Sequence, residues 1–450
     1  MKAIELVDLR TQESMILTPS LAEAREATAT GDVGALGDVN GLYALAEMGD
    51  DPNTVRMSRG ITPPLRYAVI DHGGTSTVIC AERIAPIISY IRAEMPSAEF
   101  HYTWTRMVPP FTLVELEFGP QGYTGSCSKR YIQPIPEPAE LDSISLIYAS
   151  AVYEAITGFL QRVPHGEKVA VPLSGGADSG LVYMLAHEAF KQLKRNPLDL
   201  MAVTVKLGEG GKDIEQARAL VEFLGGHGYT TKDQWHILPL APSDLPSLEE
   251  IVETIEDYKT AWDLQGARIM IAMRKALRAR WPELRYTMSG HGGDELAQDY
   301  NLGEEGLTFE EVIENPHIYV EGRIHVPGRT NPMFSGGLGR RIVIDPAALH
   351  GFTEFSPICT QGVVRVMYGV PKKELISTPE ELYGLKNTVA SLGVRALMSL
   401  TYQFPEKNRF QCGASDGRTF QQAFSALSEA EARPLFHRLM QELMQERSEQ

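Results

Sequence analysis

The chain has few cysteines and no closely spaced pair of them. Only four occur in 450 residues, at positions 80, 127, 359 and 412. Zinc sites and disulfide frameworks both need cysteines at short, regular spacings, so this usage predicts neither. Scattered free cysteines are typical of a reducing compartment, and we expect a cytoplasmic protein.

Long hydrophobic runs are also missing. A membrane-spanning helix needs about 20 predominantly apolar residues, and the sequence has no uninterrupted apolar stretch of that length. The first residues, MKAIELVDLRTQES, carry charges throughout and lack the apolar centre of a signal peptide. We therefore expect no membrane partner.

Positive charge is in short supply. The chain has 42 Lys and Arg against 58 Asp and Glu, which gives a formal net charge of −16. This balance disfavours general binding to nucleic acid or to an anionic membrane. A local basic pocket for a small anion remains compatible with it.

The chain divides into two regions of different pattern. Its length exceeds what one hydrophobic core usually serves, so two domains are expected. The first region is rich in strand patterns, such as FTLVELEF at 111–118, and is followed by YIQPIPEPAE at 131–140, with three prolines in five positions. Such a stretch is typical of a linker. We predict domains at 1–138 and 139–450.

Short apolar strands alternate with helical patterns in the second region. This alternation predicts an α/β fold, with a parallel sheet and flanking helices. Ligands of such sheets bind at the carboxyl ends of the strands. The predicted strands cover 168–173, 198–207, 235–240 and 284–290.

The first of these strands ends in a glycine-rich turn, SGGADS. Gly175 and Gly176 allow close approach of a ligand to the backbone, and the first amides of the following helix point outward, so the turn can hold a phosphate. Ser174 and Ser179 add hydroxyl donors, whereas Asp178 needs a bridging cation such as Mg²⁺ beside a phosphate. The structural alternative is a capped strand–turn–helix corner, and the lysine of a Walker loop is missing.

A second turn of the same kind follows the strand at 284–290. Its sequence is SGHGGDELAQDY, and it contains Gly290 and an aspartate, Asp294. Two strand ends in one parallel sheet can bring Asp178 and Asp294 to one Mg²⁺ ion. The pair of turns makes a purely structural interpretation of either one unattractive.

The two turns together resemble a known family. SGGADS is similar to the SGGxDS pyrophosphate loop of the ATP pyrophosphatase superfamily, and SGHGGDELAQDY resembles the SGxGxDExxxGY element of asparagine synthetases and their relatives, with Asp299 in place of a glycine. The resemblance extends over roughly residues 141–425. It implies ATP and Mg²⁺ as cofactors. It also implies attack of a substrate carboxylate on the α-phosphate of ATP, release of pyrophosphate, and displacement of AMP by an amine.

The beginning of the chain departs from asparagine synthetases. Those enzymes use an N-terminal cysteine to release ammonia from glutamine, whereas position 2 here is Lys2 and the first cysteine is Cys80. We interpret residues 1–138 as a smaller α+β domain that resembles a degenerate, inactive glutaminase of the N-terminal nucleophile type. The amine would then come from the substrate itself, as in β-lactam synthetases.

Three catalytic residues are implied by resemblance to β-lactam synthetases. GFTEFSPIC (351–359) resembles the segment that carries the glutamate of their catalytic dyad, which maps to Glu354. EKNRFQCGASDGRTF (406–420) resembles a later loop whose lysine contacts the adenylate, which maps to Lys407. The dyad tyrosine is replaced by His291, a plausible base because histidine titrates near neutrality. The alternative is that His291 only fills a polar corner.

Further contacts to ATP are implied by the same resemblance. The adenine is expected against backbone groups of Val203 and Val205. Lys386, in YGLKNTV, matches a phosphate-contacting lysine with the spacing shifted by one residue, and a solvated surface lysine is the alternative.

The resulting prediction is an ATP-dependent synthetase that adenylates an amino-acid-derived β-amino acid and closes a β-lactam ring, with a tabtoxin-like substrate as the best guess. The alternative is an intermolecular amide ligase that uses free ammonia or another amine. A nucleotide-binding scaffold without chemistry is the non-enzymatic alternative. The expected partner is a small molecule, and a homodimer is an open possibility.

Overall fold

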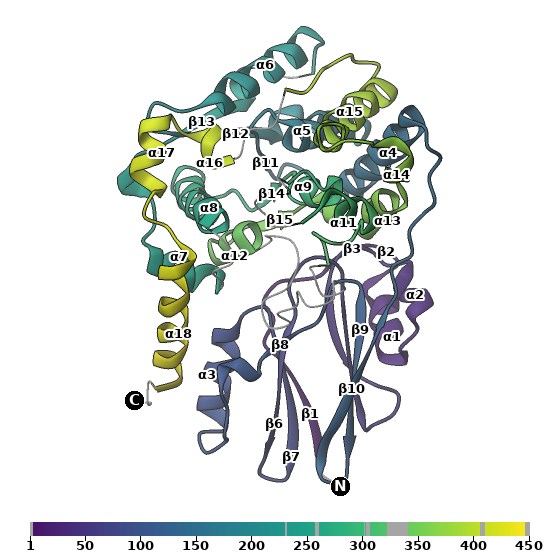
Figure 1. The fold of residues 1–450 in the computed structure, drawn as a ribbon, viewed down its shortest axis with the longest axis vertical. Coiled ribbons are helices and arrows are strands. Elements are labelled where there is room, and N and C mark those ends of the chain that lie inside the picture. The colour runs from purple at the N-terminus through teal and green to yellow at the C-terminus, as the bar shows by residue number, and fades with distance from the viewer. Residues whose placement is uncertain are drawn as a thin grey trace. The chain divides into compact units, whose positions relative to one another are not determined.

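The structure is a computed structural model that describes residues 3–229, 232–256, 261–300, 302, 307–321, 341–405 and 410–445 (Figure 1). It divides into two compact units. The first comprises Met1–Gln133, Val320–Leu338 and Ala430–Gln450, and the second comprises Pro134–Tyr319 and Gly339–Glu429. The first division of the chain falls inside the proline-rich stretch.

Two four-stranded sheets form most of the first unit. Within these sheets the strand pairs are antiparallel, except that residues 3–8 pair with residues 75–81 in parallel. One sheet has the order β1 (Ala3–Asp8), β7 (Thr75–Ala81), β6 (Arg66–His72), β8 (Arg106–Met107), and the other has the order β10 (Gly122–Arg130), β9 (Thr112–Gly119), β5 (Thr54–Arg59), β4 (Ala44–Met48). The unit also contains β2 (Met15–Thr18) paired with β3 (Asn40–Leu42), and helices α1 (Leu21–Thr30), α2 (Val33–Gly37) and α3 (Ile84–Glu94).

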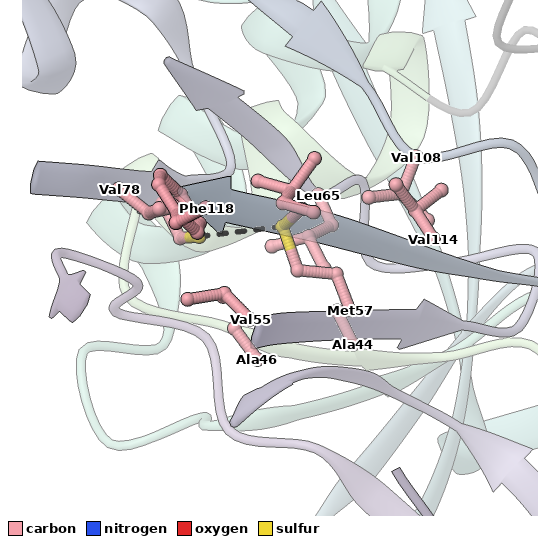
Figure 2. Close-up of a cluster of buried hydrophobic side chains, with 11 residues drawn as sticks. Ala44, Ala46, Val55, Met57, Leu65, Val78, Val108, Val114 and Phe118 are labelled. Carbon is pink, nitrogen blue, oxygen red and sulfur yellow. Dashed lines mark hydrogen bonds between the residues drawn. The ribbon is translucent and has the colours of Figure 1, made fainter. Parts of the chain in front are cut away.

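Side chains from both sheets form one apolar core (Figure 2). Successive side chains of a strand point to opposite faces. Val55 and Met57 of β5 are two residues apart, so both point to the core face. Cys80 of β7 lies in this core, with its Sγ atom 3.6 Å from the sulfur of Met57. Burial raises the pKa of the Cys80 thiol to about 12, so the thiol stays protonated and acts as a core side chain.

Two later segments of the chain belong to the first unit. The tail forms helix α18 (Glu429–Gln445). The Nδ1 atom of His437 in α18 lies 2.6 Å from the hydroxyl oxygen of Tyr102. Arg130 at the end of β10 makes two hydrogen bonds of 2.8 and 2.7 Å to the buried carboxylate of Glu321.

A five-stranded, all-parallel sheet is the centre of the second unit. Its order is β13-β12-β11-β14-β15, so the chain runs outward from β11 in one direction and then returns to the other side of β11. The α/β class and four of these strands were predicted from the sequence, and the fifth strand was not. The bounds are β11 (Val169–Pro172), β12 (Leu200–Leu207), β13 (Trp235–Leu240), β14 (Tyr286–Met288) and β15 (Thr353–Phe355).

Helices flank the sheet of the second unit: α4, α5 and α15 pack together on one side, and α8 and α12 on the other (Figure 1). Helix α4 is long and apolar enough to cross a membrane by length and composition, but half of its most apolar window is buried within the protein. It contacts α5 and α15, as a core helix does. The bounds of the helices are α4 (Leu141–Leu160), α5 (Ala177–Gln192), α6 (Lys212–Gly226), α7 (Leu248–Ile255), α8 (Ala261–Arg280), α9 (Gly293–Ala297), α11 (Phe309–Glu314), α12 (Arg341–Leu349), α13 (Gln361–Gly369), α14 (Lys372–Leu375), α15 (Pro379–Met398), α16 (Phe410–Ala414) and α17 (Gly417–Phe424).

Candidate functional site

The first glycine-rich turn joins β11 to α5 and requires its glycines. Gly175 has a φ of +82°, and a Cβ atom there would lie 2.4 Å from the backbone nitrogen of Ala217 in α6. Gly176 is the N-cap of α5 and has no side chain with which to cap it. The first amides of this 16-residue helix are therefore available to an anion.

Two hydroxyl groups shape the same turn. The Oγ atoms of Ser174 and Ser179 lie 3.0 Å apart, and the backbone N–H of Ser174 donates to Ser179 Oγ at 3.2 Å. The pair closes the turn on itself and keeps both hydroxyls beside the helix N-terminus. This arrangement suits three or more hydrogen bonds to a phosphate.

The second glycine-rich turn packs directly on the first. A Cβ atom at Gly290 would lie 2.5 Å from the backbone carbon of Asp178, and one at Gly293 would lie 2.0 Å from Asp178 Oδ1. The two turns follow β11 and β14, the neighbouring strands between which the strand order reverses. Ligands of doubly wound sheets bind at this point. The predicted convergence of the two turns is therefore present in the fold.

Lys386 of α15 lies where the two turns meet. Its ammonium group is 2.8 Å from Asp178 Oδ2 and 3.0 Å from Asp299 Oδ2, and it also contacts Asp294. Burial alone would lower the pKa of Lys386, but the three carboxylates outweigh burial and raise the pKa well above its usual value. The side chain is 7% exposed, so Lys386 is a buried, permanently charged group and not a solvated surface lysine.

The charge of this cluster fits a divalent cation. Three carboxylates around one lysine leave a net charge of −2. Among the described residues, no group of three or more His, Cys, Asp or Glu side chains is arranged to hold a metal on its own. Mg²⁺ commonly takes one or two carboxylates together with phosphate oxygens. Asp178 and Asp294, whose side chains are 20% and 29% exposed, fit that smaller donor set.

Glu354 lies on β15, directly beside Thr287 of β14 in the strand register. Its Oε2 atom accepts a hydrogen bond from Thr287 and one of 2.6 Å from Arg274 of α8. The side chains of Arg274 and Glu354 are 0% and 2% exposed, so this is a fully buried ion pair. Arg274 was not predicted from the sequence, although its place in the apolar run RIMIAMRKAL, four residues after the buried Met270, indicates a buried arginine.

The segment after Glu354 holds the backbone of His291. Ser356 Oγ and Cys359 Sγ donate to the carbonyl oxygen of His291 at 2.5 and 3.3 Å. The predicted dyad segments are therefore in contact, and Cys359 has a structural role there. The partnership of the His291 side chain with Glu354 stays a prediction, because Arg274 and Thr287 are the partners that the structure gives to Glu354.

The carboxyl end of β12 lies beside the first turn. The pairing of β11 with β12 ends at Pro172 and Val203, and Leu173 donates its N–H to Val203 O at 2.8 Å. Alternate residues of a strand direct their backbone groups to the same side, so those of Val205 point past the end of β11. This is the location expected for the adenine.

The segment that contains α16 borders the same end of β12. Ser415 forms a bridge with Leu207, and a Cβ atom at Gly413 would lie 1.9 Å from the Asp213 carboxylate. Cys412 is exposed in this segment. Lys407, predicted to contact the adenylate, lies outside the described residues.

Tyr300 closes the second motif. Its hydroxyl donates to Glu295 Oε1 at 2.9 Å, so the phenol supports the turn. Burial, together with the nearby charge of Glu295, raises the pKa of Tyr300 well above its usual value.

Comparison with known protein families matches part of the second unit. Residues 159–325 match the model of the asparagine synthase family, and this range contains both glycine-rich turns and strands β11 to β14. No curated protein matches the chain. The matched range leaves out Glu354 and Lys386, whose places follow from the geometry above. Residues 159–325 are therefore similar to the asparagine synthase family, and the match covers less than half of the chain.

Proposed function

We propose that the protein is an ATP-dependent, AMP-forming amide synthetase that activates an amino-acid-derived β-amino acid and closes it to a β-lactam. The observation that carries the proposal is the meeting of the two glycine-rich turns, with Asp178 and Asp294 on one buried lysine. Transfer of an adenylyl group needs a site that binds phosphate, carboxylates that can bind a metal, and a fixed positive charge. The first turn, the pair Asp178 and Asp294, and Lys386 are suited to these three tasks.

In the first step the substrate carboxylate attacks the α-phosphorus of ATP, and pyrophosphate leaves. The hydroxyls of Ser174 and Ser179, with the first amides of α5, hold the leaving pyrophosphate. Asp178 and Asp294 would hold Mg²⁺, which neutralises charge on the phosphates when bound. Lys386 supplies a second positive charge.

In the second step the amine of the same molecule attacks the acyl carbon, and AMP leaves. His291 takes the proton that the amine must lose, and the Glu354 carboxylate stabilises the positive charge that the histidine gains. Lys407 stabilises the oxyanion of the tetrahedral intermediate. Closing a four-membered ring makes positioning of the amine important, and positioning can contribute about 7–11 kcal/mol to catalysis.

The state of Cys80 supports an amine that does not come from glutamine. This thiol is buried in the core of the first unit, and burial raises its pKa to about 12. It is not suited to be the nucleophile of a glutaminase.

The proposal is tested with purified full-length chain, ATP, Mg²⁺ and a panel of β-amino acids, by the mass of the product. Loss of one water from the substrate is expected. A product that has gained an added amine would instead establish an intermolecular ligase, and absence of AMP formation with every carboxylate would establish a nucleotide-binding scaffold. Lys407→Met is expected to abolish product.

A further inference from the structure

The three carboxylates around Lys386 are not equivalent. Asp178 and Asp294 have side chains that are 20% and 29% exposed, whereas Asp299 is 7% exposed, like Lys386 itself. Two of the partners are thus partly exposed to solvent, and the third is as buried as the lysine. Asp299 also occupies the position at which the SGxGxDExxxGY element of related enzymes has a glycine.

The backbone around Asp299 is fixed by buried polar contacts. The N–H of Asp299 donates to Asp294 O at 2.8 Å, and the preceding Gln298 is fully buried in the left-handed conformation, with a φ of +61°. Gln298 Nε2 donates to the carbonyl oxygens of Val312 and Asn315 at 2.6 and 2.9 Å. Asp299 therefore has little freedom to follow an incoming ion.

Binding of Mg²⁺ with a phosphate ligand changes the partners of Lys386. The carboxylates of Asp178 and Asp294 are the groups that would turn toward the metal, and each would then interact less with the lysine. An ammonium group that is buried without a carboxylate is strongly destabilised. Asp299, with a side chain that is 7% exposed, is the carboxylate of this cluster that stays buried beside the lysine.

We propose that Asp299 is a positioning residue that retains the Lys386 ammonium at the phosphate site while Asp178 and Asp294 bind the metal. This inference rests on the proposed function. Lys386 acts on the pyrophosphate group, and Asp299 acts through Lys386. A glycine at this position has no side chain and could not hold the lysine, whereas the aspartate of this chain can.

The test measures binding of inorganic pyrophosphate with Mg²⁺ to the full-length chain by isothermal titration calorimetry. Four proteins are compared: wild type, Asp299→Asn, Lys386→Met and the double variant. Loss of a charged hydrogen-bond partner is expected to weaken binding by about tenfold or more in Asp299→Asn. Because Asp299 acts through Lys386, the double variant should bind no more weakly than Lys386→Met alone. Glu374→Gln, an exposed acidic residue of α14, is the control and should bind like wild type.

The outcomes separate the two proposals. If wild type does not bind magnesium pyrophosphate, the proposed function is wrong. If wild type binds and Asp299→Asn binds equally well, or if the effects of the two single variants add in the double variant, only the role of Asp299 is wrong. Circular dichroism checks the fold of each variant, and Asp299→Gly replaces Asp299→Asn in the cycle if the latter does not fold.

Discussion

Arg274 and Glu354 form a buried ion pair in which the guanidinium lies 2.6 Å from the carboxylate. The arginine comes from α8 and the glutamate from β15, so the pair links a helix on one side of the sheet to its edge strand. The guanidinium balances the charge of a carboxylate that is buried away from water. Arg274 therefore holds in place the glutamate that we propose as the partner of the base.

Arg274→Met should destabilise the protein strongly, because it leaves the Glu354 carboxylate buried without its cation. Breaking one partner of a buried pair costs about 3–5 kcal/mol. Urea unfolding measures this change, and Lys275→Met is the matched control because Lys275 pairs with Glu250 on the surface. An exposed pair contributes at most about 1 kcal/mol. Equal effects of the two substitutions would contradict the assigned role of Arg274.

Lys386→Met should make the stability of the protein depend more strongly on Mg²⁺. Without the lysine, Asp178, Asp294 and Asp299 face one another with no cation, and a divalent ion relieves their repulsion. Thermal unfolding with and without Mg²⁺ should show a larger rise in Tm for the variant than for wild type. Lys373→Met, at an exposed pair with Glu314, is the control. The same rise in all three proteins would mean that Lys386 does not neutralise this cluster.

Because of Asp213, the free energy of unfolding should fall as the pH rises from about 4 to about 8. Burial raises the pKa of its carboxyl from 3.8 to about 8. The folded state therefore binds the proton more tightly than the unfolded state. The stabilising contribution is complete below the unfolded pKa, and it is lost at about 1.4 kcal/mol per pH unit as the pH rises to the folded pKa.

Asp213→Asn should remove this part of the pH dependence, and Glu215→Gln, an exposed acid in the same helical turn, should leave it intact. Urea unfolding at several pH values between 4 and 8 measures the slope. A slope unchanged by Asp213→Asn would show that this carboxyl is ionised in the folded protein at neutral pH.

His291→Phe should slow ring closure more than adenylation. A general base contributes about 10²–10⁴-fold to a step in which a proton is transferred. ATP–pyrophosphate exchange should therefore persist in the variant while formation of the cyclic product falls. A pH–rate profile for product formation identical to that of wild type would remove His291 from the mechanism.

The features that could be predicted from the sequence are those set by local pattern. β11 and β12 are largely apolar runs, and the glycine-rich turn after β11 contains the glycines that its backbone requires. The contact between the turns could also be predicted, because a parallel sheet brings the carboxyl ends of its strands to one edge.

Features that depend on contacts distant in sequence could not be predicted in the same way. β15 has three residues, Thr353–Phe355, and exists because it pairs with β14. Arg274 precedes Glu354 by 80 residues, and Lys386 follows Asp178 by 208, so no local spacing indicates either ion pair. The attachment of α18 to the first unit depends likewise on Tyr102 and His437.

The most direct measurement is ATP–pyrophosphate exchange by wild type, Asp178→Asn and Asp294→Asn in the presence of β-amino acids and Mg²⁺. The account predicts exchange by wild type that depends on the added acid. It also predicts a loss of about 100-fold or more in each variant, since each removes a group placed to hold the charge of the transferring phosphate. Exchange at wild-type rates in both variants would contradict it.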